Sequence, residues 1–503
     1  MISKIKLCCC NLSLALFLAS MLPWGQVMAA ADVTSRALKL YENHHYEEAT
    51  RLLHPELASM DSARLAAASL ALGMSHLGNA RLYRELHQTA QVIELDYLTQ
   101  LSKQKSQASS RVVDFYLGQA LLETGKPAEG VSSLQRFVAK LAAHSPLAPF
   151  AQIELGIAYS RLKQTQKAAQ AWAGLDMSKP EIKAALAAAY AVTGAQEQNP
   201  VALADAAISD ATALRYTPSA RMLSNLLRAY SQSGATVKAL GLLNANEFKD
   251  ASYVEELGSS KSISFYDLSL LDDMAKTHLG AAVMYLEQAN RDSKLSNTAS
   301  YYLTSAYLLQ GKTELALRAA AFFLSQAQMP AQLRDLTRVN QLVAFNRAGQ
   351  KTEVTANWPT LLDKAGGDPL LLAELVLTCR QAGTDCAMLE KLAVAAVERG
   401  EGKKYFPLNV ALGKYYLLQK AYAKALLYME AGRDKAYKNK IEVNDPLMLT
   451  GLAETYYRNK KFSENLEIYF EMGKYYPVIR QIQEAMQGIY SMEHKSAGDV
   501  KIF

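Results

Sequence analysis

Glycine and proline are scarce in this chain. The 26 glycines and 14 prolines make up about 8% of the 503 residues, whereas roughly 12% is usual. A β-sandwich or barrel needs many turn residues, and a disordered chain needs few apolar ones, but here 50% of the residues are hydrophobic. Both classes are therefore excluded, and the composition predicts an all-α fold.

Sequence motifs of enzymes are also missing. The chain has no glycine-rich phosphate loop, no nucleophile elbow and no paired-histidine metalloprotease motif. One cluster, His44-His45 with Glu47-Glu48, carries metal-ligating residue types. We interpret it as a solvated turn, because adjacent residues on a turn point in different directions. We expect no enzymatic activity, no catalytic residues, no cofactor and no metal.

The N-terminus has the pattern of a secretory signal peptide. Lys4 and Lys6 accompany an apolar run over 7–22, and small residues at 29–31 offer a cleavage site. The run is too short to span a bilayer, and no later stretch reaches its length without charges. We expect cleavage after residue 31, a periplasmic location and no transmembrane segment in the mature chain. Lipidation is the weaker alternative, because the N-terminal cysteines precede the cleavage site.

Cysteine is rare, and only Cys379 and Cys386 lie beyond the predicted signal peptide. Between them, Gly383 predicts a helix end and Asp385 a helix N-cap. This places Cys379 in the last turns of one helix and Cys386 in the first turn of its antiparallel partner. Because an oxidising compartment would keep the pair bonded, we predict a Cys379–Cys386 disulfide. Two buried thiols are the alternative.

The charge balance excludes a nucleic-acid footprint. The formal net charge is only +6, and Lys4 and Lys6 of the predicted signal peptide contribute to that small excess. Proteins that bind nucleic acids through the phosphate backbone carry a larger or more clustered basic excess. No nucleic-acid partner is expected.

Small residues recur at a fixed spacing. Gly156 is followed twelve residues later by Ala168, Gly413 is followed at the same distance by Ala425, and a third copy runs over 452–477. Small residues at these positions let two antiparallel helices approach closely, while aromatic side chains fill the gap beside them. The pattern resembles the tetratricopeptide repeat, whose consensus is L-G-x2-Y, then A-x3-F, then P.

The tetratricopeptide resemblance covers about 32–490 and implies an all-α, right-handed superhelical solenoid of antiparallel helix pairs. We expect a signal peptide at 1–31, N-terminal repeats at 32–250, C-terminal repeats with a capping helix at 251–490, and a flexible tail at 491–503. The regularity lapses over 244–267, where 258–262 has the composition of a loop, and we interpret this segment as a joint between an N-terminal and a C-terminal superhelix.

One stripe of each first helix is expected to line a groove. The fifth, ninth and twelfth positions of a repeat are separated by about one turn, and the stripe is offset from the inward-packing glycine and tyrosine positions. In the last two repeats it mixes apolar, aromatic and charged residues, which favours a peptide or helix over a polyanion. The predicted partner contacts are Lys414, Leu417, Tyr457 and Arg458. An ordinary solvated surface is the alternative.

The same positions argue against one known role of the family. Tetratricopeptide domains that hold the C-terminal carboxylates of cytosolic chaperones place basic and amide residues on consecutive first helices. The ninth positions of the earlier repeats include Gln119, Ile157 and Arg228, and no adjacent pair forms such a clamp. Tyrosine pairs contribute chiefly to the core, and Tyr415 and Tyr457 are the two rings expected to face a groove.

The resemblance implies a non-enzymatic scaffold or adaptor of the bacterial periplasm or cell envelope, which binds a protein or peptide through a concave helical surface. Envelope relatives of the family act in outer-membrane protein assembly, pilus biogenesis and exopolysaccharide export. The alternative is a glycan-binding component of an exopolysaccharide export system that uses exposed tyrosines and lysines. A periplasmic hydrolase is a third and weaker hypothesis.

Overall fold

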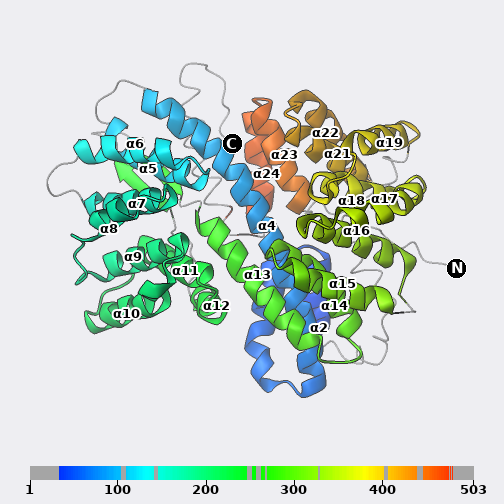
Figure 1. Ribbon diagram of the computed structural model, residues 1–503, viewed down its shortest axis with the longest axis horizontal. Coiled ribbons are helices and arrows are strands. Elements are labelled where there is room, and N and C mark those ends of the chain that lie inside the picture. The colour runs from blue at the N-terminus through cyan, green and yellow to red at the C-terminus, as the bar shows by residue number, and fades with distance from the viewer. Residues whose placement is uncertain are drawn as a thin grey trace. The chain divides into compact units, whose positions relative to one another are not determined.

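Antiparallel helix pairs make up nearly all of the described chain (Figure 1). The computed structural model describes residues 33–103, 109–140, 146–245, 252–256, 262–266, 269–326, 329–400, 406–438, 446–474, 476 and 479. The predicted solenoid of helix pairs is confirmed. The predicted signal peptide, most of the capping helix and the whole tail lie outside the described residues. Within these residues, no helix combines the length and apolar character needed to cross a bilayer.

The chain divides into two compact units that are not contiguous in sequence. Unit 1 comprises Met1–Asn79 and Ala281–Ile468, and unit 2 comprises Ala80–Gly280 and Tyr469–Phe503. The division therefore differs from the single boundary near residue 250 that the sequence predicted.

A close contact explains why N-terminal helices belong to the same unit as later repeats. Gly73 lies in α4 (Ser62–Lys103), and Leu286 lies in α13 (Ser269–Ala289). A Cβ added to Gly73 would lie 2.6 Å from Leu286 Cγ. A sequence pattern does not reveal such packing between segments more than 200 residues apart.

Unit 2 contains four consecutive helix pairs, and in each pair the two helices pack on each other. The first helices α5, α7, α9 and α11 also pack on their neighbours in series. The bounds are Ser109–Glu123 (α5), Pro127–Ala139 (α6), Ala148–Arg161 (α7), Thr165–Trp172 (α8), Pro180–Thr193 (α9), Gln196–Gln198 (η3, a 3-10 turn), Pro200–Ala213 (α10), Ala220–Gln232 (α11) and Thr236–Ala245 (α12).

Unit 1 contains the remaining pairs. Its helices, some shared with unit 2 along the chain, are Val33–Glu42 (α2), Tyr46–Leu53 (α3), His54–Ser59 (η2), Ser296–Leu309 (α14), Thr313–Ser325 (α15), Ala331–Arg347 (α16), Lys351–Ala365 (α17), Pro369–Ala382 (α18), Cys386–Glu398 (α19), Phe406–Leu418 (α21), Tyr422–Lys438 (α22), Pro446–Arg458 (α23) and Phe462–Gly473 (α24). The few prolines mostly open helices, where the missing N–H costs nothing.

The turn inside each pair has the same backbone conformation. In nine pairs of the described chain the turn contains one residue with positive φ, between 59° and 76°, as in Gly349 (74°) and Lys420 (59°). The turn between α9 and α10 contains two, Gly194 (74°) and Asn199 (44°). The N–H of the next residue then closes the helix end, as Gln350 does by donating to the Phe345 carbonyl at 2.9 Å. Glycine adopts this left-handed conformation without strain, which explains why the scarce glycines gather in these turns.

Two β-strands lie within the segment 244–267, where the repeat pattern lapses. Strands β1 (Ser252–Glu256) and β2 (Ser262–Tyr266) pair antiparallel, with Ser252 opposite Tyr266 and Glu256 opposite Ser262. Of the predicted loop at 258–262, residues 258–261 lie outside the described residues, and Ser262 begins β2. The aromatic and β-branched residues on either side of this loop favour strands.

Close approach within the pairs occurs where the repeat spacing predicts it. A Cβ added to Gly156 would lie 2.0 Å from Trp172 Nε1, and one added to Gly413 would lie 2.6 Å from Met429 Cγ. The Trp172 indole N–H also donates to the Ile153 carbonyl at 3.2 Å. The glycine on the first helix thus provides the space that the large side chain of the second helix occupies.

The turn between α2 and α3 is only partly solvated, which corrects the sequence interpretation at His44 and Glu47. His44 is 4% exposed, and its Nδ1 lies 2.9 Å from the Tyr46 hydroxyl. Burial raises the pKa of Glu47 to about 7, although the Arg51 guanidinium opposes the rise. Local spacing placed the turn correctly, but it does not show which turn residues the neighbouring helix covers. No group of three or more metal-ligating side chains occurs among the described residues.

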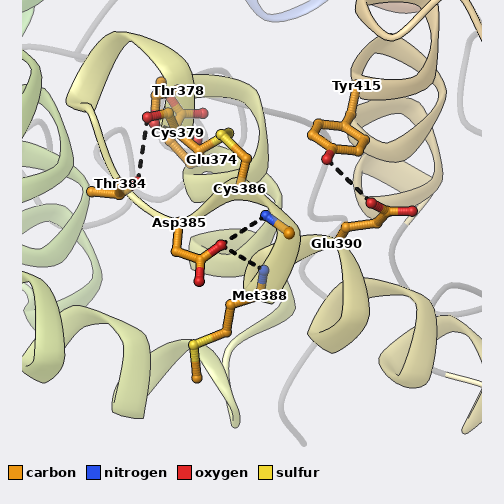
Figure 2. Close-up of a disulfide and its surroundings, with 10 residues drawn as sticks. Glu374, Thr378, Cys379, Thr384, Asp385, Cys386, Met388, Glu390 and Tyr415 are labelled. Atoms are coloured by element: carbon orange, nitrogen blue, oxygen red, sulfur yellow. Dashed lines mark hydrogen bonds between the residues drawn. A yellow bond between two sulfur atoms is a disulfide. The ribbon is translucent and has the colours of Figure 1, made fainter.

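The sulfur atoms of Cys379 and Cys386 are bonded (Figure 2). Cys379 lies in the last turn of α18, which ends at the left-handed Gly383, and Cys386 is the first residue of α19. Asp385 caps α19, because its Oδ1 accepts hydrogen bonds from the backbone N–H groups of Ala387 and Met388 at 3.0 and 3.1 Å. The helix end and the N-cap thus lie where the sequence predicts them, and they place the two cysteines on facing turns.

Replacing Gly156 by Ala should destabilise the protein by about 1–3 kcal/mol, because the Trp172 ring must move to admit the new methyl group. The matched control is Gly241→Ala in α12, where no atom lies within 4 Å of the added Cβ. That change should stabilise by roughly 0.5–1 kcal/mol, since alanine is the better helix former. Thermal unfolding of the mature protein measures both, and equal shifts would contradict the close packing.

Mature protein isolated from an oxidising compartment should contain no free thiol. Reduction should lower the stability by about 2–3 kcal/mol, the chain-entropy value for so short a loop. Thiol titration of the denatured, unreduced chain measures the bond, and unfolding with and without reductant measures its effect. The double variant Cys379→Ser with Cys386→Ser should not respond to reductant. Two free thiols per mature chain would rule out the disulfide.

Candidate functional site

A groove opens on the first-helix side of unit 2. Its lining comes from α5, α7, α9 and α11, together with Glu94 of α4, and the space between these side chains, open solvent included, amounts to about 720 Å³. No second helix of the four pairs contributes to the lining. The groove therefore lies on the face where consecutive repeats together form one continuous surface.

Short side chains make room in the middle of the groove. α9 contributes only Ala185 and Ala188 to the lining, between longer side chains of α7 and α11. Ile153 and Ile157 of α7 provide an apolar wall. The groove thus combines apolar side chains of α7 and α9 with charged groups on α4, α5, α7 and α11.

An ion-pair network holds Arg228 of α11. The Arg228 Nε donates to Asp273 Oδ2 at 3.2 Å, and Nη2 donates to Glu123 Oε1 at 3.5 Å. Asp273 also accepts hydrogen bonds from the Ser231 hydroxyl at 2.9 Å and the Gln232 amide at 2.8 Å. Burial raises the pKa of Asp273 to about 6, although Arg228 opposes the rise. Arg228 is therefore compensated by two carboxyl groups of the protein itself.

His87 of α4 extends this network. Its Nε2 lies 3.7 Å from Glu123 Oε2. Burial favours the neutral imidazole, but the carboxylates of Glu123, Asp272 and Asp273 outweigh burial and raise the pKa of His87. Glu123 consequently has positive partners on two helices.

Glu154 of α7 has fewer partners. Its Oε1 accepts a hydrogen bond from the Gln119 amide at 2.9 Å. Burial raises the pKa of the Glu154 carboxyl, and the Glu123 charge adds to this effect, while Arg228 and Arg161 oppose it. Arg161 donates to a backbone carbonyl, that of Leu122. Among the described residues, no basic side chain lies within ion-pair distance of Glu154.

Arg221 lies at another part of the lining, against two aromatic side chains. Its guanidinium carbon is 4.7 Å from the centre of the Phe150 ring, and Nη2 donates to the Tyr116 hydroxyl at 3.3 Å. These contacts hold the long side chain in one orientation. The groove thus combines fixed charges, hydrogen-bonding groups and apolar walls, which is the chemistry of a binding surface.

The residues predicted as partner contacts lie elsewhere, in unit 1. Lys414 and Leu417 belong to α21, and Tyr457 and Arg458 belong to the neighbouring α23. Lys414, Tyr457 and Arg458 are half-buried, and the Arg458 guanidinium lies 5.3 Å from the centre of the Tyr422 ring. The structure therefore places all four residues on two adjacent helices and leaves three of them partly exposed.

Leu417 packs inside unit 1 with only 9% of its surface exposed, which corrects the prediction that it contacts a partner. The next residue, Leu418, is 60% exposed. In unit 2 the fifth-position residue Ile153 and the ninth-position residues Ile157 and Arg228 do line the groove. One residue rotates a helix by about 100°, which separates the buried Leu417 from the exposed Leu418.

More tyrosines of the adjacent pairs are buried in the core than the sequence predicted. Tyr415 was expected to face a groove, but it is buried, and its hydroxyl donates to Glu390 of α19 at 3.1 Å (Figure 2). Tyr416 donates to the same carboxyl group at 2.7 Å, and Tyr456 is also buried. Tyr457 keeps partial exposure. The structure therefore removes most of the rings that a stacking surface for sugars would need.

The sequence interpretation passed over the groove of unit 2. The ninth-position residues Gln119, Ile157 and Arg228 do line it, although together they form no basic clamp. Arg221 and Glu154 were not singled out. The seven-residue spacing of Arg221 and Arg228, two turns of one helix, is the signal that could have revealed a charged stripe.

No family model and no curated protein sequence matches the chain. Among solved structures it is similar to the P58(IPK) TPR domain, at 13% identity, covering 77% of this chain and 99% of that one, with a TM-score of 0.21. It is also similar to the APC/C hetero-tetramer Cut9–Hcn1, at 13% identity, covering 95% of this chain and 96% of that one, with a TM-score of 0.26. A third similar structure is the pentatricopeptide repeat protein PPR10 from maize, at 16% identity, covering 96% of this chain and 71% of that one, with a TM-score of 0.26. At such low TM-scores, the helical-repeat fold rests on the helix pairs described above.

Proposed function

We propose that the protein is a non-enzymatic scaffold of the bacterial periplasm or cell envelope, which binds a segment of a partner protein in the groove of unit 2. The observation that carries the proposal is the groove itself, lined by four consecutive first helices. Side chains from four repeats can contact an extended segment at several points, as binding surfaces of repeat proteins do.

Two features support the proposed compartment. The sequence over 1–31 has the charge, apolar run and small residues of a secretory signal peptide. The bonded Cys379 and Cys386 suit an oxidising compartment. Assembly or export of envelope components is the role that best fits a soluble binding surface placed there.

A polysaccharide partner is less favoured than a protein. Tyr415, Tyr416 and Tyr456 are buried, so they offer no stacking surface to sugar rings. An acidic polysaccharide would also need a row of uncompensated basic groups, whereas Arg228 in the groove is paired with Glu123 and Asp273. Alternating charges and apolar walls suit a peptide segment of mixed composition better.

Photo-crosslinking should detect the partner at the groove. p-Benzoylphenylalanine in place of Asn225, which lines the groove, should give a covalent adduct with a partner protein in cells of the source organism. The same probe in place of Val237 is the matched control, because Val237 lies on the second helix α12 and is 71% exposed. Adducts at Val237 but not at Asn225, or identical adducts at both, would count against the groove.

The face around Lys414, Tyr457 and Arg458 is proposed as a second contact surface. Changing Lys414 and Tyr457 together to Ala should weaken capture of the partner while lowering stability by only about 1 kcal/mol, the value of one aromatic contact. That contact is with Phe462, whose ring centre lies 6.0 Å from that of Tyr457. Quantitative pull-down and a melting curve measure the two effects. Unchanged capture by a folded variant would remove this face from the proposal.

A further inference from the structure

We infer that the groove of unit 2 recognises a lysine or arginine side chain of its partner, with Glu154 as the carboxylate that receives the cationic group. The inference rests on the proposed function, since it names the side chain that the bound segment inserts. It depends on three observations within unit 2: the distribution of charges, the single hydrogen bond of Glu154, and the shape of the lining.

The charges of the groove favour a cation. The lining contains three carboxyl groups, Glu94, Glu123 and Glu154, and two guanidinium groups, Arg221 and Arg228. The network around Arg228 is already complete, because Glu123 and Asp273 both bond to it. An anionic ligand at Arg228 would have to displace these carboxylates, whereas a cation at Glu154 displaces no ion pair of the described residues.

Glu154 has unused capacity to accept hydrogen bonds. An ionised carboxylate accepts about four, but among the described residues only the Gln119 amide donates to Glu154, through Oε1. Burial raises the pKa of Glu154, which means that its ionised form lacks stabilisation in the free protein. An ammonium or guanidinium group from a ligand would supply both the missing donors and the missing positive charge.

The lining also fits the stem of such a side chain. Ile153 and Ile157 on α7 and the short Ala185 and Ala188 on α9 form an apolar path beside Glu154. Lysine and arginine have three or four methylene groups below their charged ends, which pack on apolar surface. A hydrated metal ion has no apolar part that could pack on these side chains. No group of three or more metal-ligating side chains occurs among the described residues.

Three terminally blocked peptides test the inference: acetyl-AAKAA-amide and its counterparts with norleucine or glutamate at the centre. The methyl signals of Ile153 and Ile157 in the isotope-labelled mature protein report binding in the groove. We expect the lysine peptide to bind at least tenfold more tightly than the norleucine peptide, and the glutamate peptide to bind no better than norleucine. Glu154→Gln should abolish the difference between lysine and norleucine. Glu129→Gln, on the exposed face of α6, should preserve it.

The pH dependence provides a second measurement on the unaltered protein. Glu154 attracts the cation only when its carboxyl group is ionised. Affinity for the lysine peptide should therefore fall as the pH is lowered through the raised pKa of Glu154. The norleucine peptide should not share this fall. Arg228, Arg161, Glu123 and Gln119 are the polar groups that act on Glu154, and of these Glu123 alone is another carboxyl. In Glu154→Gln the pH dependence should therefore be largely lost.

The outcomes separate this inference from the proposed function. If norleucine or glutamate peptides bind as tightly as the lysine peptide, the groove binds peptides but does not select a cation, and only the inference fails. If none of the peptides moves the two isoleucine signals at millimolar concentration, both the cation site and peptide binding in this groove are contradicted. If the Glu154→Gln variant does not fold, the unaltered protein still tests the inference. The ratio of its affinities for the lysine and norleucine peptides, and the pH dependence of that ratio, show whether the groove selects a cation.

Discussion

The close approach of two helices inside each pair is the constraint on which the rest of the structure depends. At Gly156 the first helix lacks a side chain, and the Trp172 ring of the second helix occupies the space. This contact fixes which side of the first helix faces its partner. The opposite side is thereby left for the groove, and the left-handed turn residues keep successive pairs in the same geometry. Packing inside a pair thus determines where a ligand can be contacted.

Groove chemistry in unit 2 follows from what each first helix places on its free side. α9 offers only alanines there, so the groove has depth, while α5, α7 and α11 offer charged and aromatic groups. Burial makes each of these charges costly unless it is paired. Arg228 meets that requirement through Glu123 and Asp273, whereas Glu154 has one amide donor within the part of the chain that the structure describes. A partly compensated charge in a binding surface is a point where a ligand can gain affinity.

The two units show how local repeats and global organisation differ. Each helix pair forms from residues close in sequence, yet the N-terminal pair belongs with repeats that follow residue 281. Leu286 beside Gly73 illustrates the kind of contact responsible, since neither residue is marked by the repeat spacing. Repeat proteins allow this because each pair has two faces that accept any neighbour of suitable shape.

By itself the sequence determined the all-α class, the helix pairs and their turns, and the facing positions of Cys379 and Cys386. These features depend on residues within about 40 positions of each other, and small residues, prolines and caps specify them locally. Tertiary structure alone decided that His44, Tyr415 and Leu417 are buried, and that Glu154 and Arg221 share a groove. Burial and charge compensation are set by neighbours from other repeats, and a one-residue rotation of a helix exchanges a packed side chain for a groove-lining one.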